Sequence, residues 1–366
     1  MPCPTPSAGH CVTRNRKRYT HLAPAFFHHI RLFLGLLCLL TAVPVQARTV
    51  TDCLGRAVTV PDRVERLVVL SRDMLELVRA VGAMSRVVGV SDTLRRDPAF
   101  WSELRDVPVV GRWNDPDYEA IARLAPDVLL AYGRYPDPEA ETKLGAAGIP
   151  VLRLEVHLLS GFDATARTVG AVLGREAAME TLLAWRADKF ARLAACQRQA
   201  RETPLVYLEG YQRQQAWGPG TSGDESLAVA GGRNLAAGLA TSYGEVSPEW
   251  VLAGAPEAVI KITPLPGRYE DRDGTALAAE VRGLTERPGF GALAAVGQGR
   301  VYVLASDVHG GPRAPVGAGY EARWLHPGQC LDIDPPAWNR EYLERFQHVP
   351  FQGAYAWPLP ASGNGS

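Results

Sequence analysis

Aromatic and cationic side chains stand close to the ends of several apolar runs that read as β-strands. In an open sheet of parallel strands, a ligand binds beyond the carboxyl ends of the strands. Flat amphipathic rings grip a large planar ligand with little loss of entropy, and guanidinium groups pair with anionic oxygens. On this ground, the side chains that we expect to contact a ligand are Trp113, Arg72, Tyr132, Arg134, Tyr211, Trp217 and Arg313.

Each of these side chains also has a purely structural explanation. A tryptophan or tyrosine near a strand end also closes the rim of a hydrophobic core, and an arginine also projects into solvent. The sequence alone leaves both readings open.

A metal site built from side chains is the next chemistry to consider. After residue 47 the histidines are His157, His309, His326 and His348, and only His309 falls in a segment where a ligand-facing loop is expected. A tetrahedral or octahedral site needs three or four converging ligands. We therefore expect no metal bound by the protein itself, and we expect His326 and His348 at the surface.

Catalytic motifs are equally scarce. Residues 220–224 read Gly-Thr-Ser-Gly-Asp, which is neither a nucleophile elbow nor a phosphate-binding loop, and no Gly-x-Ser-x-Gly or Walker pattern occurs. We expect a glycine-rich turn at this position and a further turn at 225–230. No catalytic residue is predicted.

Two segments about 130 residues apart, 118–130 and 247–260, repeat the same pattern. Each reads as a short helix with a glutamate in its first turn, then a proline followed by an acid, then an apolar strand. Glu119 and Glu249 occupy equivalent places, where a negative charge suits the helix dipole. The repeat predicts a two-lobed α/β protein that presents one such glutamate on each lobe.

The elements between these segments fit that architecture. Apolar runs alternate with helical stretches over 48–160 and again over 203–347, which predicts parallel-rich sheets covered by helices. Residues 161–202 lack proline and predict one linking helix about 60 Å long, with Gly170 and Gly174 as its weak points. Residues 348–366 are rich in proline, glycine and serine and predict a disordered tail.

The N-terminus predicts export. Residues 1–47 hold five basic residues and no acid, followed by an apolar run of 12 residues and small residues at 45–47. That pattern is typical of a signal peptide cleaved after Ala47, and the apolar run is too short for a stable membrane anchor. The long basic stretch also leaves the true start codon open downstream of Met1.

The charge and the cysteine content of the mature chain limit the possible functions further. The mature chain keeps 34 basic and 39 acidic residues, a formal charge of −5, which excludes a general nucleic-acid binder. Only Cys53, Cys196 and Cys330 remain, so at most one disulfide forms, and the pairing stays open.

Several short motifs carry a family resemblance from about residue 48 to 346. They are the opening 51–61, Gly111-Arg112-Trp113 ahead of Glu119, and Ala230-Gly231-Gly232-Arg233-Asn234-Leu235 ahead of Glu249. In order and spacing, the chain resembles the periplasmic binding proteins of the vitamin B12 and ferric-siderophore class, which serve ABC importers. The resemblance implies two Rossmann-like lobes joined by one long helix, with the ligand in the cleft between them.

The resemblance also implies a function. It predicts a monomeric periplasmic receptor, with no intrinsic cofactor, that binds a ferric siderophore, haem or a corrinoid. The receptor would deliver this chelate to a permease dimer, on which Glu119 and Glu249 would dock through arginines. Two alternatives remain: a secreted enzyme that acts on a chelate in the same cleft, and a receptor for a bare metal ion.

Overall fold

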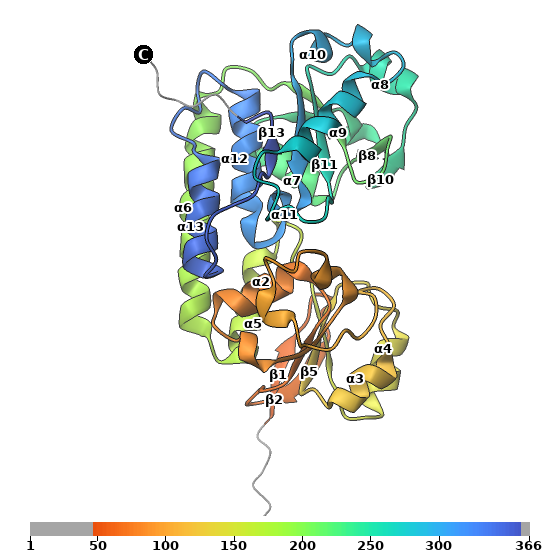
Figure 1. Cartoon of the computed structure of the whole chain (residues 1–366), viewed down its shortest axis with the longest axis vertical. Helices are drawn as coiled ribbons and strands as arrows, with labels where there is room; N and C mark the ends of the chain where they lie inside the picture. The colour runs from red at the N-terminus through yellow and green to blue at the C-terminus, as the bar shows by residue number, and fades with distance from the viewer. Residues whose placement is uncertain (1–46, 360–366) are drawn as a thin grey trace, which may run out of the picture. The chain divides into compact units, whose positions relative to one another are not determined.

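The protein is described by a computed structural model over residues 47–359 (Figure 1). The predicted signal peptide, apart from Ala47, and the end of the predicted tail at 360–366 lie outside the described residues. None of the helices within 47–359 combines the length and the apolar character needed to span a bilayer.

The N-terminal lobe is built on a four-stranded parallel sheet with the order β4-β3-β5-β6. An antiparallel hairpin, β1 with β2, precedes it. The elements of this lobe are β1 (Ala47–Thr51), β2 (Ala57–Pro61), β3 (Leu67–Val69), α2 (Arg72–Ala80), η1 (Met84–Arg86), β4 (Val87–Val90), η2 (Asp92–Arg96), η3 (Ser102–Leu104), α3 (Tyr118–Leu124), β5 (Val128–Tyr132), α4 (Glu139–Gly145) and β6 (Val151–Leu154).

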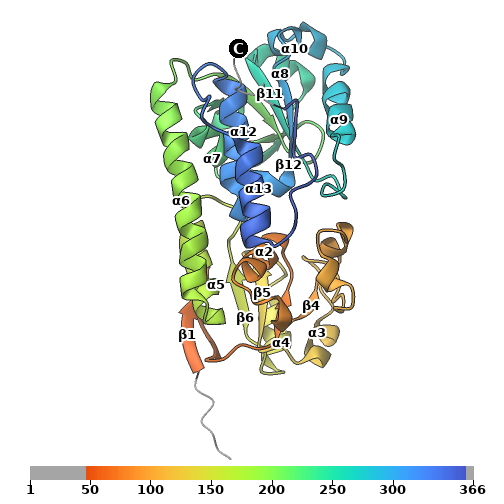
Figure 2. The ribbon, with the colours of Figure 1, turned by 60° about the vertical axis from the view of Figure 1, so that its left-hand side comes forward.

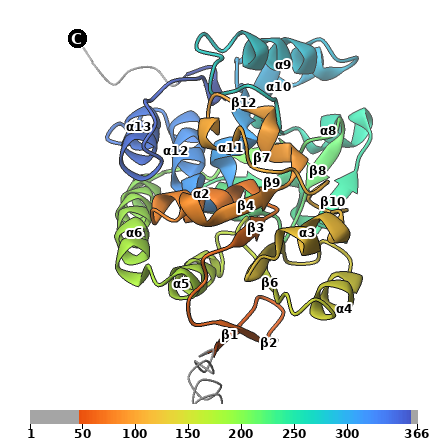
Figure 3. The same ribbon diagram turned by 60° about the horizontal axis from the view of Figure 1, so that its bottom comes forward.

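Both faces of this sheet are covered. Leu67 and Val69 of β3 join one buried cluster, which includes α2, whereas Val68 joins another with Ile121 of α3 and Leu144 of α4. Successive strand residues point to opposite faces, so each face buries every second side chain. Figure 3 shows α3 and α4 side by side. The continuous apolar runs follow from this burial on two sides.

The C-terminal lobe contains a seven-stranded mixed sheet with the order β10-β8-β7-β11-β12-β13, and β9 also pairs with β7. Strands β7, β11 and β12 are parallel neighbours, whereas β8, β10 and β13 join in antiparallel fashion. Its elements are β7 (Leu205–Glu209), β8 (Gln215–Trp217), α7 (Ser222–Val229), β9 (Arg233–Asn234), η4 (Leu235–Gly238), β10 (Tyr243–Glu245), α8 (Pro248–Gly254), β11 (Ala258–Thr263), α9 (Thr275–Thr285), η5 (Phe290–Ala292), α10 (Ala294–Gly297), β12 (Val301–Ala305), α11 (Ser306–His309), η6 (Gly311–Arg313), α12 (Ala314–Leu325), α13 (Pro335–Phe346) and β13 (Ala356–Trp357).

The linking segment is two helices, so the prediction of one continuous helix over 161–202 is wrong. Helix α5 (Phe162–Leu173) ends at Gly174, which is left-handed at φ +60°, and α6 (Glu176–Gln199) follows. The amide of Arg175 turns back to the carbonyl of Gly170 at 2.8 Å, which closes the end of α5. A Cβ on Gly170 would stand 2.9 Å from the Cβ of Met179, so glycine lets the two helices pack closely. The two weak points of the prediction are therefore the residues that make the break.

Helices α6, α12 and α13 lie side by side (Figure 2). A disulfide joins Cys196, near the end of α6, to Cys330, which follows α12, and Cys53 is free and exposed. The disulfide settles the pairing that the sequence left open.

Two further expectations are corrected. Residues 222–229 form helix α7 in place of the expected turns, although Gly220 before the helix does lie in a turn at φ 77°. The Thr221 side chain caps the helix by accepting a hydrogen bond from the amide of Asp224 at 3.2 Å. The described part of the predicted tail is ordered: β13 pairs with β12, and Tyr355 and Ala356 are buried. Burial of these residues against the sheet outweighs the loop-like composition around them.

Candidate ligand-binding site

The carboxyl ends of the parallel strands supply most of the candidate side chains. In the N-terminal lobe, Arg72 begins the helix after β3, Tyr132 ends β5, and His157 follows β6. In the C-terminal lobe, Tyr211 follows β7 and His309 follows β12. Equivalent ends of the two sheets therefore carry the same kinds of side chain, as the placement rule for open sheets predicts.

Trp113, Tyr132, Tyr135 and His157 form what we call the N-terminal aromatic cluster. The ring centroid of Trp113 lies 5.9 Å from that of Tyr132 and 5.1 Å from that of Tyr135, both edge to face. The imidazole of His157 stacks on Tyr132 at 5.3 Å. Tyr135 is exposed, and Trp113 and Tyr132 are half-buried. The cluster thus presents a large aromatic surface that keeps some access to solvent.

Tyr211, Trp217, Tyr243 and His309 form the C-terminal aromatic cluster. Trp217 is buried at its centre, with ring centroids of Tyr211, Tyr243 and His309 at 5.2, 5.7 and 5.0 Å. Tyr211 and Tyr243 are exposed. The predicted contact residue Trp217 therefore supports the exposed rings, and the predicted contact residue Tyr211 is one of these exposed rings.

Burial and nearby groups raise the pKa values of two tyrosines in these clusters. Burial, followed by the charges of Asp73 and Glu155 and by Tyr211 and Tyr243, raises the pKa of Tyr132 well above its ordinary value of 10. Burial and then the carboxylate of Glu155 raise the pKa of Tyr243. Geometry brings the two clusters together: a Cβ on Gly310, next to His309, would stand 2.9 Å from the carbonyl oxygen of His157, and Arg72 pairs with Asp307 across the lobes. The two aromatic clusters therefore border a common region where the lobes meet.

His309 shares a hydrogen bond of 2.8 Å between its Nε2 and the Oγ of Ser222. Serine beside histidine is the composition of a nucleophile with its base. Both side chains are buried, however, and burial lowers the pKa of His309 to about 4, which makes the imidazole a weak base at neutral pH. The pair is therefore better suited to holding α7 against α11 than to catalysis.

Charged side chains join the lobes beside the aromatic clusters. The side chain of Arg72 is 29% exposed and forms an ion pair with the buried Asp307 of the other lobe. Its Nε also lies 3.3 Å from Oε1 of Glu76. Burial and then the neighbouring Glu76 raise the pKa of Asp73 to about 6, against the opposing effect of Arg72. The predicted ligand contact Arg72 is thus already paired within the protein.

Arg313 is fully buried, contrary to the expectation that it meets a ligand. Its guanidinium donates to Glu76 at 2.6 and 3.1 Å, and the Tyr342 hydroxyl donates to the same carboxylate at 2.9 Å. The geometry gives Arg313 a role in joining the lobes. Of the three predicted arginines, only Arg134 is exposed.

Three further residues lie in this region that the sequence did not single out as candidate ligand contacts. Glu155 and His157 follow β6 closely, so the strand-end rule would have found them. Tyr243 lies on the antiparallel strand β10, where no such rule applies.

The expectation that His326 lies at the surface is wrong. Its side chain is buried against Gly231, and burial lowers its pKa.

The repeated glutamates occupy matching local structures. Asp117 caps α3 and Ser247 caps α8 through side-chain hydrogen bonds, and both helices span seven residues. Each helix ends at a left-handed alanine, Ala125 at φ 44° and Ala255 at φ 43°. Glu119 and Glu249 are exposed in the first turns. The predicted repeat therefore exists as structure.

The acid after each proline explains why the repeat folds in the same way. The Asp127 carboxylate accepts the amides of Glu65 and Arg66 at 2.7 and 2.9 Å, and the Glu257 carboxylate accepts the amide of Leu205 at 2.9 Å. In both lobes the acid ties the helix end to the start of the neighbouring strand. Each glutamate helix is thereby fixed to its own sheet.

Metal-ligating side chains do not gather here. Within residues 47–359, no group of three or more His, Cys, Asp or Glu side chains is arranged to hold a metal ion.

Comparison with known proteins identifies the family. Residues 67–308 match the model of the periplasmic binding protein family, and the chain belongs to it. It is a solute-binding protein of the ABC-importer type, in a family of binding proteins rather than enzymes. Membership implies a periplasmic location, a small-molecule ligand and a permease partner.

Individual relatives differ in what their names say they bind. The molybdate-binding protein MolA of Haemophilus influenzae is 28% identical over 128 residues, 33% of this chain and 36% of MolA, so the match spans about a third of that relative. The structure of FepB from Veillonella parvula is 21% identical with a TM-score of 0.74, over 85% of this chain and 99% of that one. A periplasmic haem-binding protein from Pseudomonas aeruginosa is 27% identical with a TM-score of 0.60, over 73% and 94%. The two-lobed α/β fold is thus confirmed.

Proposed function

We propose that this protein captures a metal chelate with a flat conjugated face, of the haem class, between its two aromatic clusters and delivers it to an ABC permease. The proposal rests on the pair of clusters, each with at least one exposed tyrosine, a tryptophan and a histidine, which border one region. Aromatic side chains bind planar rings by stacking and by apolar burial.

The arginines bear on the three chelates that the family resemblance raises. Anionic groups, whether on a ferric siderophore or on the propionates of haem, call for arginines that are not already paired. Arg72 and Arg313 are engaged by Asp307 and Glu76, so of the three predicted arginines only Arg134 is exposed to meet such a group. A site with one exposed arginine and large aromatic surfaces suits a mostly apolar ring with carboxylates at its edge better than a highly charged siderophore, and a corrinoid carries bulky groups on both faces. The 27% identical haem-binding protein of Pseudomonas aeruginosa adds support for a haem-class ligand.

Delivery would use the repeated glutamates. Glu119 and Glu249 stand exposed on equivalent helices, one on each lobe, and each helix is tied to its sheet. Rigid, exposed carboxylates are suited to pair with arginines of a dimeric permease, one lobe for each subunit. The receptor would act as a monomer, and its ligand would leave unchanged.

An absorption spectrum tests the choice of ligand. The protein would be isolated from the periplasm of its own bacterium without added ligand. We expect the intense near-ultraviolet band of a porphyrin. If the spectrum instead shows the visible bands of a corrinoid or of a ferric catecholate, that chelate is the ligand and the choice of the haem class is wrong. A colourless protein that carries molybdate by mass spectrometry would contradict the chelate proposal.

A further inference from the structure

Two of the exposed tyrosines of the aromatic clusters lie in loops. Tyr135 lies in the loop 133–138 after β5 and is 48% exposed, and Tyr211 lies in the loop 210–214 after β7 and is 46% exposed. Loops after strands are ordinarily the mobile parts of a fold. A ligand that must order both loops would lose affinity through their entropy.

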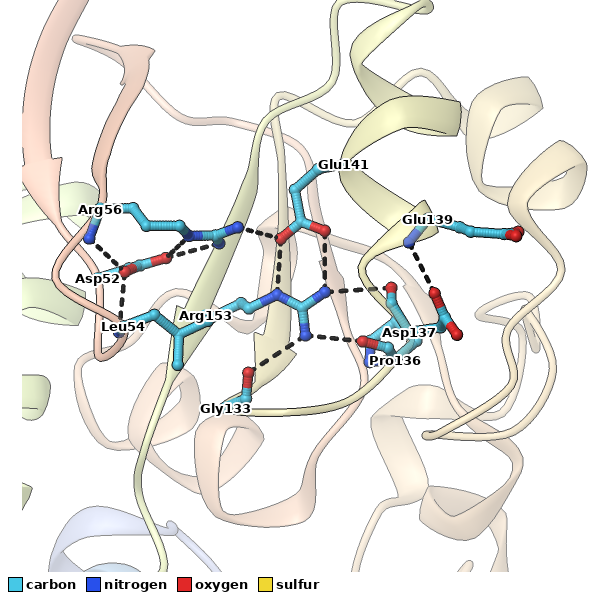
Figure 4. Close-up of polar contacts among 9 residues, drawn as sticks. All are labelled: Asp52, Leu54, Arg56, Gly133, Pro136, Asp137, Glu139, Glu141 and Arg153. Atoms are coloured by element: carbon cyan, nitrogen blue, oxygen red, sulfur yellow. Dashed lines mark hydrogen bonds and ion pairs between the residues drawn. The ribbon is translucent and has the colours of Figure 1, made fainter.

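The backbone of the first loop is held by the side chain of Arg153 of β6, which is buried at 2% exposure. Its guanidinium donates to the carbonyls of Gly133 at 3.2 Å, Pro136 at 2.7 Å and Asp137 at 3.2 Å (Figure 4). These carbonyls flank Tyr135 on both sides. A single buried side chain therefore fixes the backbone of the loop.

Arg153 is itself held by a second layer of charges. The Glu141 carboxylate of α4 accepts from its Nε at 2.6 Å and its Nη2 at 2.9 Å, and Arg56 reaches the same carboxylate at 2.6 Å (Figure 4). Burial opposes the charged form of Glu141, but the hydrogen bonds from Arg153 and Arg56 lower its pKa to about 2. The carboxylate stays ionised, so the guanidinium keeps one orientation.

The second loop is held in a comparable way by Lys261 of β11. Its ammonium donates to the Gly210 carbonyl at 3.1 Å and to the Glu209 carboxylate at 3.0 Å. Glu209, fully buried, also accepts the amide of Gln214 at 3.0 Å and the guanidinium of Arg287 at 2.8 Å. The start and the end of the loop around Tyr211 are thus tied to one buried ion pair.

We infer that Arg153 and Lys261 are positioning residues, which hold the two tyrosine loops in the ligand-binding conformation before the ligand arrives. Buried ion pairs are often no more stabilising than apolar side chains of the same volume, so net stability alone does not account for them. Their distinct effect is to fix backbone carbonyls in place, as supporting groups of a binding site do. This inference rests on the proposed function, because it takes the tyrosine loops as ligand contacts.

A kinetic consequence separates positioning from contact. If the loops sample other conformations, only a fraction of the molecules has the conformation that binds the ligand. The apparent affinity is then reduced in proportion to that fraction. The association rate then falls while the dissociation rate stays the same. Removal of a direct contact, as in Tyr211→Ala, would instead speed dissociation.

The test uses Arg153→Lys and Lys261→Met in the full mature chain. Lysine cannot reach three carbonyls at once, and methionine keeps the volume of Lys261 without its charge. The matched controls are Arg79→Lys and Lys189→Met: both residues are buried and paired, Arg79 with Glu103 and Lys189 with Glu341, but neither contacts the two loops. Should Arg153→Lys fail to fold, Glu141→Gln loosens the same guanidinium.

Hydrogen exchange of the unliganded proteins is the first measurement. We expect exchange about 10-fold faster at 133–139 in Arg153→Lys and at 210–215 in Lys261→Met, because local opening becomes easier. The controls should leave both loops protected. Loop protection equal to that of the controls would overturn the inference.

Stopped-flow binding of haemin is the second measurement. Association should slow by about 3-fold to 10-fold in each positioning variant, with dissociation unchanged. Faster dissociation with unchanged association would also overturn the inference, since it would make the residues contacts. If the wild-type protein binds no chelate, the proposed function fails, and hydrogen exchange still decides whether the loops are held as described.

Discussion

Glu76 of α2 and Arg313, which directly precedes α12, are 237 residues apart in the chain and meet in a buried ion pair with hydrogen bonds of 2.6 and 3.1 Å. Burial opposes the charged form of Glu76, but Arg313 and then Arg72 lower its pKa, and Tyr342 completes its hydrogen bonding. The pair joins one lobe to the other in the interior of the protein.

Loss of one partner should therefore destabilise the protein strongly. Arg313→Met leaves the Glu76 carboxylate buried without its main partner, and we expect a loss of about 3–5 kcal/mol in the free energy of unfolding. Denaturant unfolding measures it. Arg167→Met, which removes the exposed pair with Glu180, is the control and should cost less than about 1 kcal/mol. Equal losses in the two variants would contradict a stabilising role for the inter-lobe pair.

The pH dependence of stability should reveal Glu321 of α12. Burial raises its pKa to about 8, against the hydrogen bond from Ser226, whereas the unfolded chain has the ordinary value of 4.5. The folded state therefore holds a proton that the unfolded state releases between these values. Its stabilising effect is complete below pH 4.5 and is lost as the pH rises towards 8, by up to about 1.4 kcal/mol per pH unit.

Glu321→Gln should remove this contribution. The variant keeps a neutral side chain at every pH, so its free energy of unfolding should fall less than that of the wild type between pH 5 and pH 8. Chemical unfolding at both pH values provides the comparison. Parallel pH profiles for the two proteins would show that Glu321 does not take up a proton on folding.

Trp113 supplies the aromatic surface between Tyr132 and Tyr135. Trp113→Ala should weaken binding of haemin by about 1–3 kcal/mol, the range of a buried aromatic anchor. Fluorescence or absorbance titration measures the affinity. Trp250→Ala is the control, because Trp250 is also half-buried but packs in the core of the other lobe. An affinity equal to that of the control would place Trp113 outside the ligand contacts.

Charge reversal at both repeated glutamates should separate docking from capture. Glu119→Arg with Glu249→Arg should nearly abolish binding to the cognate permease, because like charges would meet at the docking surface, and chelate affinity should stay unchanged. Wild-type docking should also weaken as salt rises. Glu344→Arg, a reversal of an exposed glutamate on α13, is the control. Lost chelate binding with docking intact would instead assign the two glutamates to the ligand site.

The repeated segments were predictable from sequence because their signals are local. A capping side chain, a first-turn glutamate, and a proline followed by an acid each act within a few residues, and the structure confirms both copies. The break at Gly174 was only half predictable. Glycine marks a weak point in a helix, but the turn depends on the close packing of Met179 on Gly170.

The side chains of the site were less predictable because their partners are distant in sequence. Strand-end placement singled out Tyr132 and Tyr211, which do lie in the two aromatic clusters. It could not show that Arg313 meets Glu76, that Arg72 meets Asp307, or that Trp217 is covered by Tyr211 and Tyr243. An arginine after a strand has the same sequence pattern whether it binds a ligand or joins two lobes.

The most direct test of the central claim is an equilibrium titration of the ligand-free protein with haemin, followed by recovery of the ligand. We expect saturation at one chelate per chain and haemin released chemically unchanged. The Tyr132→Ala, Tyr211→Ala double variant should bind haemin at least 10-fold more weakly, because it loses two aromatic contacts worth about 1 kcal/mol or more each. Turnover of haemin would support the enzyme alternative. Wild-type affinity in the double variant would show that the aromatic clusters do not hold the ligand and would contradict the account.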